Sequence, residues 1–76
     1  MEISNAFGKV LRELRLKAGL TQEQLALEAD IRRTFVSVLE LGQQQPSITT
    51  IFKFATALKI PASEIIEMGE SKIQEK

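Results

Sequence analysis

The chain has 76 residues, of which 43% are hydrophobic and 26% are charged, and its ten Lys and Arg balance ten Asp and Glu to a formal net charge of zero. A chain of this length supports one domain, which buries about two thirds of its unfolded surface. It contains no cysteine and no histidine, so disulfides, cysteine-based zinc sites and the commonest general base are all excluded. We expect no metal and no cofactor.

Two broad classes of protein are disfavoured by the same composition. An enzyme would need a pocket that excludes water, and this chain has neither the length nor a glycine-rich phosphate loop to form one. A membrane protein would need a long apolar run, whereas apolar residues here run for four positions or fewer. We therefore expect a cytoplasmic protein that is not an enzyme and does not contact the membrane.

The first predicted helix starts at Ser4 or Asn5, either of which is a good N-cap, and ends near Ala18, with Gly19 at its C-terminal stop. Apolar side chains recur at helical spacing along it and predict one buried face. These expected core residues are Phe7, Val10, Leu11, Leu14 and Ala18.

Residues 21–42 predict two short helices joined by a tight turn. Thr21 and Gln24 have the spacing of a capping box, so the first helix begins near Gln22. A turn follows at residues 29–31, and Gly42 ends the second helix. The expected inward residues are Leu25, Ala26, Ala29, Ile31, Val36 and Leu39. The expected outward residues are Arg33, Thr34, Ser37, Val38 and Leu41. Such a pair of helices is typical of a helix-turn-helix.

Two further helices are expected before the C-terminus. Ser47 caps the first, which ends before Pro61, and a short helix at residues 62–68 is stopped by Gly69. The inner face of the first is predicted to consist of Ile48, Ile51, Phe52, Ala55 and Leu58. The prediction is thus an all-α, compact five-helix bundle at residues 1–69, followed by a frayed polar tail at residues 70–76. An apolar excess near the C-terminus predicts a homodimer interface formed by Phe54, Ile65, Ile66 and Met68.

Three segments carry a family resemblance. GLTQEQLALEA, RTFVSVLELG and PSITTIFKFATALKI resemble the lambda repressor and Cro type of helix-turn-helix protein, the Xre family, and the resemblance covers about three quarters of the chain. Within that family, RTFVSVLELG and SITTIFKFATALKIPASE are similar to the small single-domain controller proteins of restriction-modification systems. The resemblance implies a lambda repressor-like DNA-binding domain whose third helix enters the major groove.

The resemblance also implies roles for individual residues. Base edges would be read by Arg32, Arg33, Thr34, Ser37 and Val38. Among these, the forked donors of Arg33 suit guanine, although an arginine near a helix start is also commonly only solvated. The expected phosphate contacts are Gln22, Gln43, Gln44, Ser47 and Lys53. For the glutamines at residues 43–45, a simple hydrophilic loop remains the alternative.

One further implied feature is a structural ion pair between Arg15 and Glu40. Physical reasoning supports it, because an acid on the inner side of the third helix needs a partner.

Four positions depart from the family pattern. Asp30 stands where the turn usually has glycine, Arg32 replaces a small N-cap, Phe35 replaces a frequent tyrosine, and Leu41 replaces a basic residue or asparagine. Asp30 tolerates left-handed geometry, so the turn remains feasible. The loss of polar groups predicts weak binding to non-specific DNA and reliance on dimerisation.

The leading interpretation is a sequence-specific, double-stranded DNA-binding transcriptional regulator of prokaryotic or phage type, which binds a palindromic operator as a dimer. The alternative is a protein-interaction module or antitoxin-like partner protein on the same fold, with weak or no DNA binding. RNA polymerase and a toxin protein remain open as further partners. The sequence does not separate a restriction-modification, phage or toxin-antitoxin setting.

Overall fold

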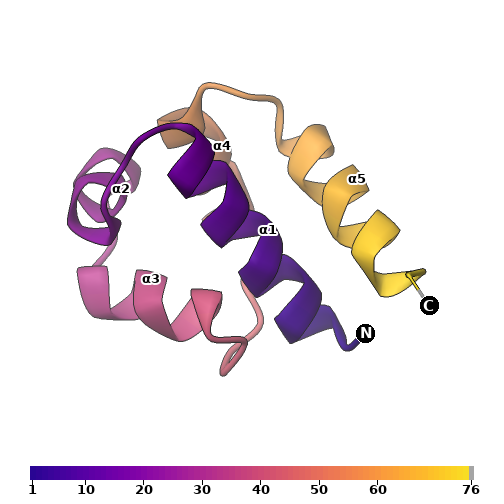
Figure 1. The fold of residues 1–76 in the computed structure, drawn as a ribbon. Coiled ribbons are helices and arrows are strands. Elements are labelled where there is room, and N and C mark those ends of the chain that lie inside the picture. Colours follow the sequence, from indigo (N-terminus) through magenta and orange to yellow (C-terminus); the bar gives the residue numbers. More distant parts are fainter. Residues whose placement is uncertain (76) are drawn as a thin grey trace.

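The computed structural model describes residues 1–75, and these form five helices and no strand (Figure 1). The helices are α1 (Ile3–Lys17), α2 (Gln22–Ala29), α3 (Arg33–Glu40), α4 (Ile48–Leu58) and α5 (Ala62–Ile73). The predicted all-α bundle with a helix-turn-helix is confirmed.

The core lies between α1 and the other helices. Helix α1 packs against α3, α4 and α5, while α2 packs against α3 and α4, and α4 also contacts α5. The buried apolar residues that form one cluster are Val10, Leu11, Leu14, Leu25, Ala26, Ala29, Val36, Leu39, Ile51, Phe54, Ala55, Ala57 and Ile65. The alanines let the helices approach closely, while Phe54 and the leucines fill the centre.

Three of the predicted helix ends are confirmed. Gly19 follows α1 with a φ of +74°, a conformation that costs glycine no steric strain. Thr21 and Gln24 form the predicted capping box at the start of α2. Ser47 caps α4, since its hydroxyl oxygen accepts a hydrogen bond from the amide of Thr50 at 3.1 Å.

The start of α1 differs from the prediction. The helix begins at Ile3 with Glu2 as its N-cap, so neither Ser4 nor Asn5 caps it. The carbonyl of Glu2 already accepts the amide of Ala6 at 2.9 Å. Ser4 and Asn5 therefore lie inside the first turn, where their side chains have no capping role.

Three residues expected in the core lie at the surface instead. Ala18 is exposed, and Ile48 and Phe52 on α4 are 65% and 59% exposed. Helix α4 is turned so that Thr50 and Phe54 face inward. Its apolar residues cover so wide an arc that periodicity alone favoured the wrong edge of that arc.

The prediction for the C-terminus is wrong in a related way. Helix α5 runs through Gly69 to Ile73, so residues 70–73 are helical rather than frayed. A Cβ atom at Gly69 would collide with the ring of Phe7. This glycine therefore serves close packing between α5 and α1, and Lys72 strengthens that contact through an ion pair to Glu13 at 3.0 Å. The last residue of the predicted tail, residue 76, lies outside the described residues.

Two of the four predicted dimer-interface residues are unavailable at the surface. Phe54 and Ile65 are fully buried inside a single chain, so their inclusion was wrong. Ile66 is 40% exposed, and Met68 is half-buried against the core. Burial of Phe54 follows from the rotation of α4, and burial of Ile65 follows because only one of two adjacent isoleucines can face inward.

Gly8 is expected to be essential for the contact between α1 and α3. A Cβ atom there would lie 2.5 Å from the carbonyl oxygen of Leu39 and 2.9 Å from that of Glu40. Helix propensity alone predicts that Gly8→Ala stabilises the protein by about 1 kcal/mol. We expect the opposite, a loss of about 1–3 kcal/mol in the free energy of unfolding, because backbone carbonyls cannot rotate away.

Urea denaturation would measure this change, with the exposed Lys9→Ala as the control on the same helix. A stabilised Gly8→Ala protein would contradict the close approach of α1 and α3.

Candidate nucleic-acid interface

The turn between α2 and α3 sets the crossing of these two helices. Asp30 has the left-handed backbone expected of it, with φ of +56° and ψ of +49°. The amide of Ile31 then donates to the carbonyl of Ala26 at 3.0 Å, which closes the end of α2. Aspartate thus performs the role for which glycine is usual.

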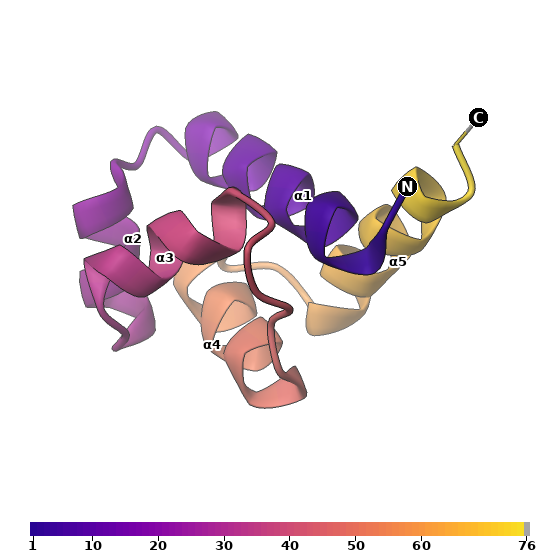
Figure 2. The ribbon, with the colours of Figure 1, turned by 90° about the horizontal axis from the view of Figure 1, so that it is seen from below.

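Helix α3 presents one face to the core and the other to solvent. Val36 and Leu39 are fully buried, and their burial fixes which side chains point outward. In Figures 1 and 2, α3 lies along one side of the molecule with no other helix outside it. Arg32 occupies the N-cap position of α3, and its side chain makes no capping hydrogen bond. This agrees with the expectation from its replacement of a small capping residue.

The five predicted base-contacting residues divide into two groups by exposure. Arg32, Arg33 and Thr34 are exposed at the start of α3, whereas Ser37 and Val38 are half-buried further along it. The amino-terminal half of α3 is therefore more open to solvent than its carboxyl-terminal half.

An open hollow joins the starts of α2 and α3. It is lined by Arg15, Thr21, Gln22, Glu23 and Arg33. One predicted base contact, Arg33, thus shares a surface with one predicted phosphate contact, Gln22. The sequence placed them 11 positions apart, and the helix-turn-helix crossing brings them together.

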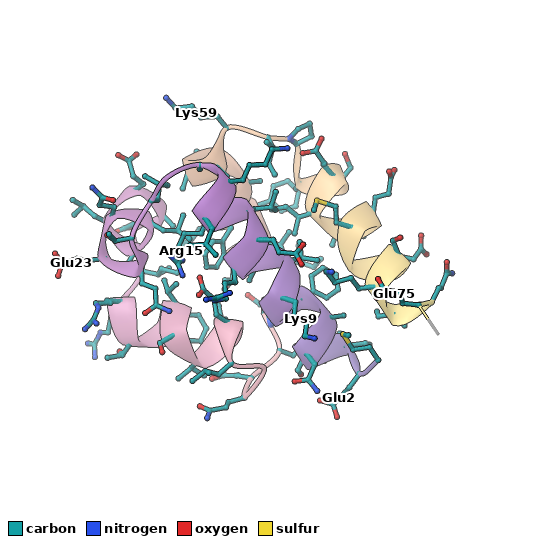
Figure 3. The ribbon with its side chains drawn as sticks, viewed as in Figure 1. Glu2, Lys9, Arg15, Glu23, Lys59 and Glu75 are labelled. Atoms are coloured by element: carbon teal, nitrogen blue, oxygen red, sulfur yellow. The ribbon has the colours of Figure 1, made fainter. Side chains whose placement is uncertain are left out.

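One residue that lines this hollow, Arg15, forms a buried ion pair with Glu40. Arg15 Nε lies 2.7 Å from Glu40 Oε2 and Arg15 Nη2 lies 3.0 Å from Glu40 Oε1, so the pair is bidentate. The two side chains are 10% and 3% exposed. The predicted pair between Arg15 and Glu40 is confirmed. Figure 3 shows Arg15 reaching from α1 towards the space between α2 and α3.

Two additional hydrogen bonds of this network were not predicted. Arg15 Nη1 donates to the carbonyl oxygen of Leu20 at 2.8 Å, and Gln22 Nε2 donates to Glu40 Oε1 at 3.1 Å. The signal available in the sequence was the capping box, which places Gln22 at the first position of α2. The Glu40 carboxylate thus connects α1, α2 and α3, and the Arg15 guanidinium also holds the loop that follows α1.

The electrostatics of the pair favour its charged form. The pKa of Arg15 is raised by its hydrogen bond to Glu40, while burial of the guanidinium opposes this rise. A bidentate geometry with further hydrogen bonds is the arrangement in which a buried ion pair offsets its desolvation.

The remaining predicted phosphate contacts are spread over the adjoining surface. Gln43 and Gln44 are exposed in the loop after α3, and Lys53 is exposed on α4. Ser47 is also exposed, but its hydroxyl already accepts the amide of Thr50. Any contribution of Ser47 to phosphate binding would therefore come from its position at the start of α4, because its hydroxyl is already used in capping.

Two other kinds of feature are absent from the described part of the chain. Among residues 1–75, no group of three or more carboxylates is placed to hold a metal ion. Over the same residues, every helix falls short of the length and apolar character needed to cross a bilayer.

Comparison with known proteins gives a consistent result. A helix-turn-helix family model matches residues 11–65. Control protein C.BamHI of Bacillus amyloliquefaciens is 36% identical over 62 residues, which cover 80% of this chain and 76% of that protein. The cryptic phage CTXphi transcriptional repressor RstR of Vibrio cholerae is 30% identical over 92% of this chain and 63% of its own length.

A solved structure extends this similarity to three dimensions. The restriction-modification controller protein C.AhdI from Aeromonas hydrophila has a TM-score of 0.79 and 44% sequence identity, covering 82% of this chain and 94% of that chain. The family resemblance expected from the sequence is confirmed.

Removal of the Glu40 carboxylate charge is expected to destabilise the fold strongly. Glu40→Gln should lower the free energy of unfolding by about 2–4 kcal/mol, because the Arg15 guanidinium is left buried without its partner charge. The double variant Arg15→Met with Glu40→Leu should recover part of this loss. Urea denaturation of the single and double variants measures both effects.

The exposed pair between Lys72 and Glu13 supplies the control. Its acid is 54% exposed, so Glu13→Gln should cost no more than about 1 kcal/mol. Equal losses for Glu40→Gln and Glu13→Gln would contradict a special role for the buried pair.

Proposed function

The chain belongs to the helix-turn-helix family of DNA-binding transcriptional regulators, and on that premise we propose that it binds an operator sequence-specifically with α3 in the major groove. The observation that carries this proposal is the exposed amino-terminal half of α3, which has Arg33 and Thr34 at its tip and no other helix outside it. A major groove admits one helix and offers a distinct donor and acceptor pattern for each base pair.

The proposed base contacts follow from the chemistry of each side chain. Arg33 donates to O6 and N7 of a guanine, and Thr34 donates to a base or phosphate, or offers its methyl group to thymine. Val38 supplies only apolar contact, which suits a thymine methyl group. Arg32 and Ser37 lie beside them and complete the proposed reading surface.

The proposed phosphate contacts surround this surface. The start of α2 presents backbone amides and the Gln22 side chain beside the hollow, and the start of α4 presents the amides near Ser47. Gln43, Gln44 and Lys53 extend the contact along the DNA backbone. Because Gln22 is held by Glu40, its side chain is fixed before DNA arrives, which lowers the entropy lost on binding.

We further propose that a homodimer binds a palindromic operator, with half-sites about one helical turn, or roughly 10 base pairs, apart. A net charge of zero limits the electrostatic contribution to DNA affinity. Two copies that bind the same operator together would provide the affinity that one copy lacks. The names of C.BamHI and C.AhdI support control of restriction-modification genes as the setting. Such a regulator acts in the cytoplasm beside RNA polymerase and has no catalytic activity of its own.

One observation favours a second function. Leu41 at the end of α3 is 64% exposed, and with Val38 it gives this helix a more apolar outer face than DNA contact requires. A protein-interaction module or an antitoxin-like partner that binds a toxin would use such a face. The two functions differ in what they require of Arg33.

Selection of bound sequences from a random pool of double-stranded DNA tests the proposed function. A palindromic winner with half-sites about one turn apart is expected. Binding that ignores sequence, or no enrichment at all, would favour the interaction module.

The Arg33→Ala variant is expected to lose discrimination at one base pair of each half-site. The loss should be about 1–3 kcal/mol per contact, because the bidentate donors to guanine are removed. Titration of the selected operator and of single-base variants measures it.

Lys17→Ala is the charge-matched control. Lys17 is exposed at the end of α1 and, with Leu58 and Ile60, lines a different depression from the hollow that contains Arg33. If both variants bind every operator variant equally well, the proposed role of Arg33 is wrong.

A further inference from the structure

The outer face of α3 carries a row of aliphatic groups. Thr34, Val38 and Leu41 have the i, i+4, i+7 spacing of residues that share one side of a helix. The two fully buried residues of α3, Val36 and Leu39, lie on the opposite side. Two members of the row are wholly aliphatic, and Thr34 adds a methyl group beside its hydroxyl. This row is named the aliphatic stripe.

Leu41 belongs to the stripe although it follows the last helical residue. As the C-cap of α3 it has φ of −79° and ψ of −4°, which is right-handed helical geometry. Its amide also donates to the carbonyl of Ser37 at 3.0 Å. The helical register therefore continues through Leu41, whose side chain is 64% exposed.

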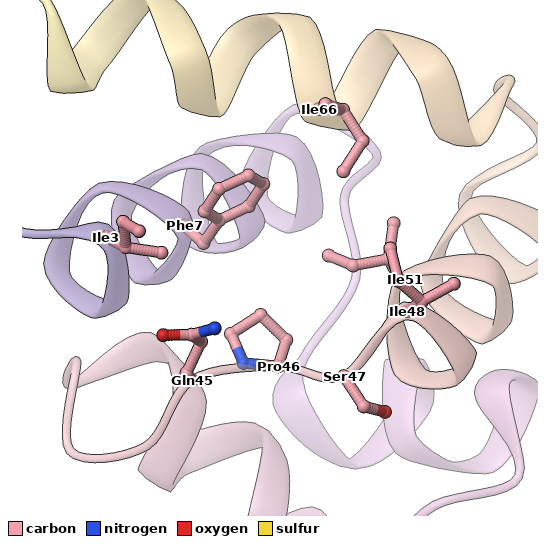
Figure 4. A pocket seen from close by; sticks show the side chains of 8 residues that line it. All are labelled: Ile3, Phe7, Gln45, Pro46, Ser47, Ile48, Ile51 and Ile66. Carbon is pink, nitrogen blue, oxygen red and sulfur yellow. The ribbon is translucent and has the colours of Figure 1, made fainter.

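The stripe is separate from the other apolar feature of the surface. Figure 4 shows a pocket whose walls come from α1, α4, α5 and the loop before α4. Its apolar lining residues are Ile3, Phe7, Pro46, Ile48, Ile51 and Ile66. Leu41 is not one of them, so its exposure needs an explanation of its own.

The charges of α3 leave the stripe open to DNA. Glu40 is the one acid of this helix, and its carboxylate is turned inward to Arg15. The stripe therefore presents no negative charge that would repel a phosphate. Arg33, in the first turn of the same helix, is exposed and supplies a positive charge.

The major groove of DNA contains one apolar group that matches the stripe, the C5-methyl group of thymine. The other groups on base edges are hydrogen-bond donors and acceptors, which lose their partners against aliphatic carbon. From Thr34 to Leu41 the helix rises about 10.5 Å, and successive base pairs are about 3.4 Å apart. The stripe is therefore long enough to face several base pairs in succession.

We propose that the aliphatic stripe reads thymine methyl groups, and that Leu41 is a further specificity-determining residue. Each half-site then carries thymines where Val38 and Leu41 face it, beside the guanine that Arg33 contacts. This inference rests on the proposed function, because it needs α3 in the major groove. Apolar contact requires no excess of positive charge, which agrees with a chain of zero net charge.

Replacement of single thymines by uracil in the selected operator tests the proposal. Uracil keeps the O4 acceptor and the pairing with adenine, so the exchange removes only the methyl group. The unmodified protein should lose about fourfold in affinity for each half-site that lacks the methyl group facing Leu41, as expected for one buried carbon. Titration of each duplex at one fixed salt concentration measures the loss.

Leu41→Ala identifies the methyl group that Leu41 contacts. At that position the variant should bind the thymine and uracil operators equally well, because its shorter side chain no longer reaches the base. Leu41 is largely exposed, so the urea midpoint of the variant should not change. Leu27→Ala is the matched control, because Leu27 is 82% exposed on α2. The control should keep the fourfold loss with uracil.

The outcomes separate this inference from the proposed function. An enriched operator that binds equally well with thymine or uracil at every position overturns the inference and leaves the function. A loss with uracil that persists in Leu41→Ala, or that Leu27→Ala also removes, overturns it as well and favours a protein partner for Leu41. Absence of any enriched sequence overturns both.

Discussion

The bidentate pair between Arg15 and Glu40 is the interaction on which the rest of the structure depends. Glu40 ends α3, Arg15 lies on α1, and the same carboxylate accepts the side chain of Gln22 at the start of α2. The three helices that determine the direction of the reading surface therefore meet at one buried charge. Because an unpaired charge at this depth is costly, the helices cannot move apart independently. Electrostatics here provides orientation, while the apolar cluster provides most of the driving force for folding.

Close helix contacts make that orientation possible. Gly8 allows the carbonyl groups at the end of α3 to approach α1, and Gly69 allows α5 to approach Phe7. Neither glycine has a positive φ, so both are needed for their lack of a side chain rather than for backbone freedom. The carboxyl end of α3 is thus anchored twice, by backbone contact at Gly8 and by the Glu40 network. Its amino-terminal half, which carries Arg33, is free to project.

The two surfaces of the molecule complement each other. The start of α3 offers hydrogen-bond donors but little net positive charge, while the surface beside α4 and α5 is apolar. In the proposed dimer two copies of α3 bind the DNA together, because a chain with zero net charge gains little electrostatic affinity for DNA by itself. The loop after α3 lies between the two surfaces, since Gln43 and Gln44 are exposed in it while Gln45 and Pro46 line an apolar pocket with Ile48 and Ile66.

The sequence by itself determined the number and order of the helices, the capping box at Thr21 and Gln24, the turn at Asp30 and the ion pair of Arg15 with Glu40. These features depend on local chemistry or on a family pattern of fixed spacing. It did not determine the rotation of α4, where two overlapping apolar arcs fit one periodicity, so Phe52 was expected inside and Phe54 at an interface. It also suggested that the last helix stops at Gly69. A sequence does not distinguish a glycine that ends a helix from a glycine that makes room for a neighbouring aromatic ring. Only the tertiary structure decided these points, because burial depends on which other helix occupies the space opposite each side chain.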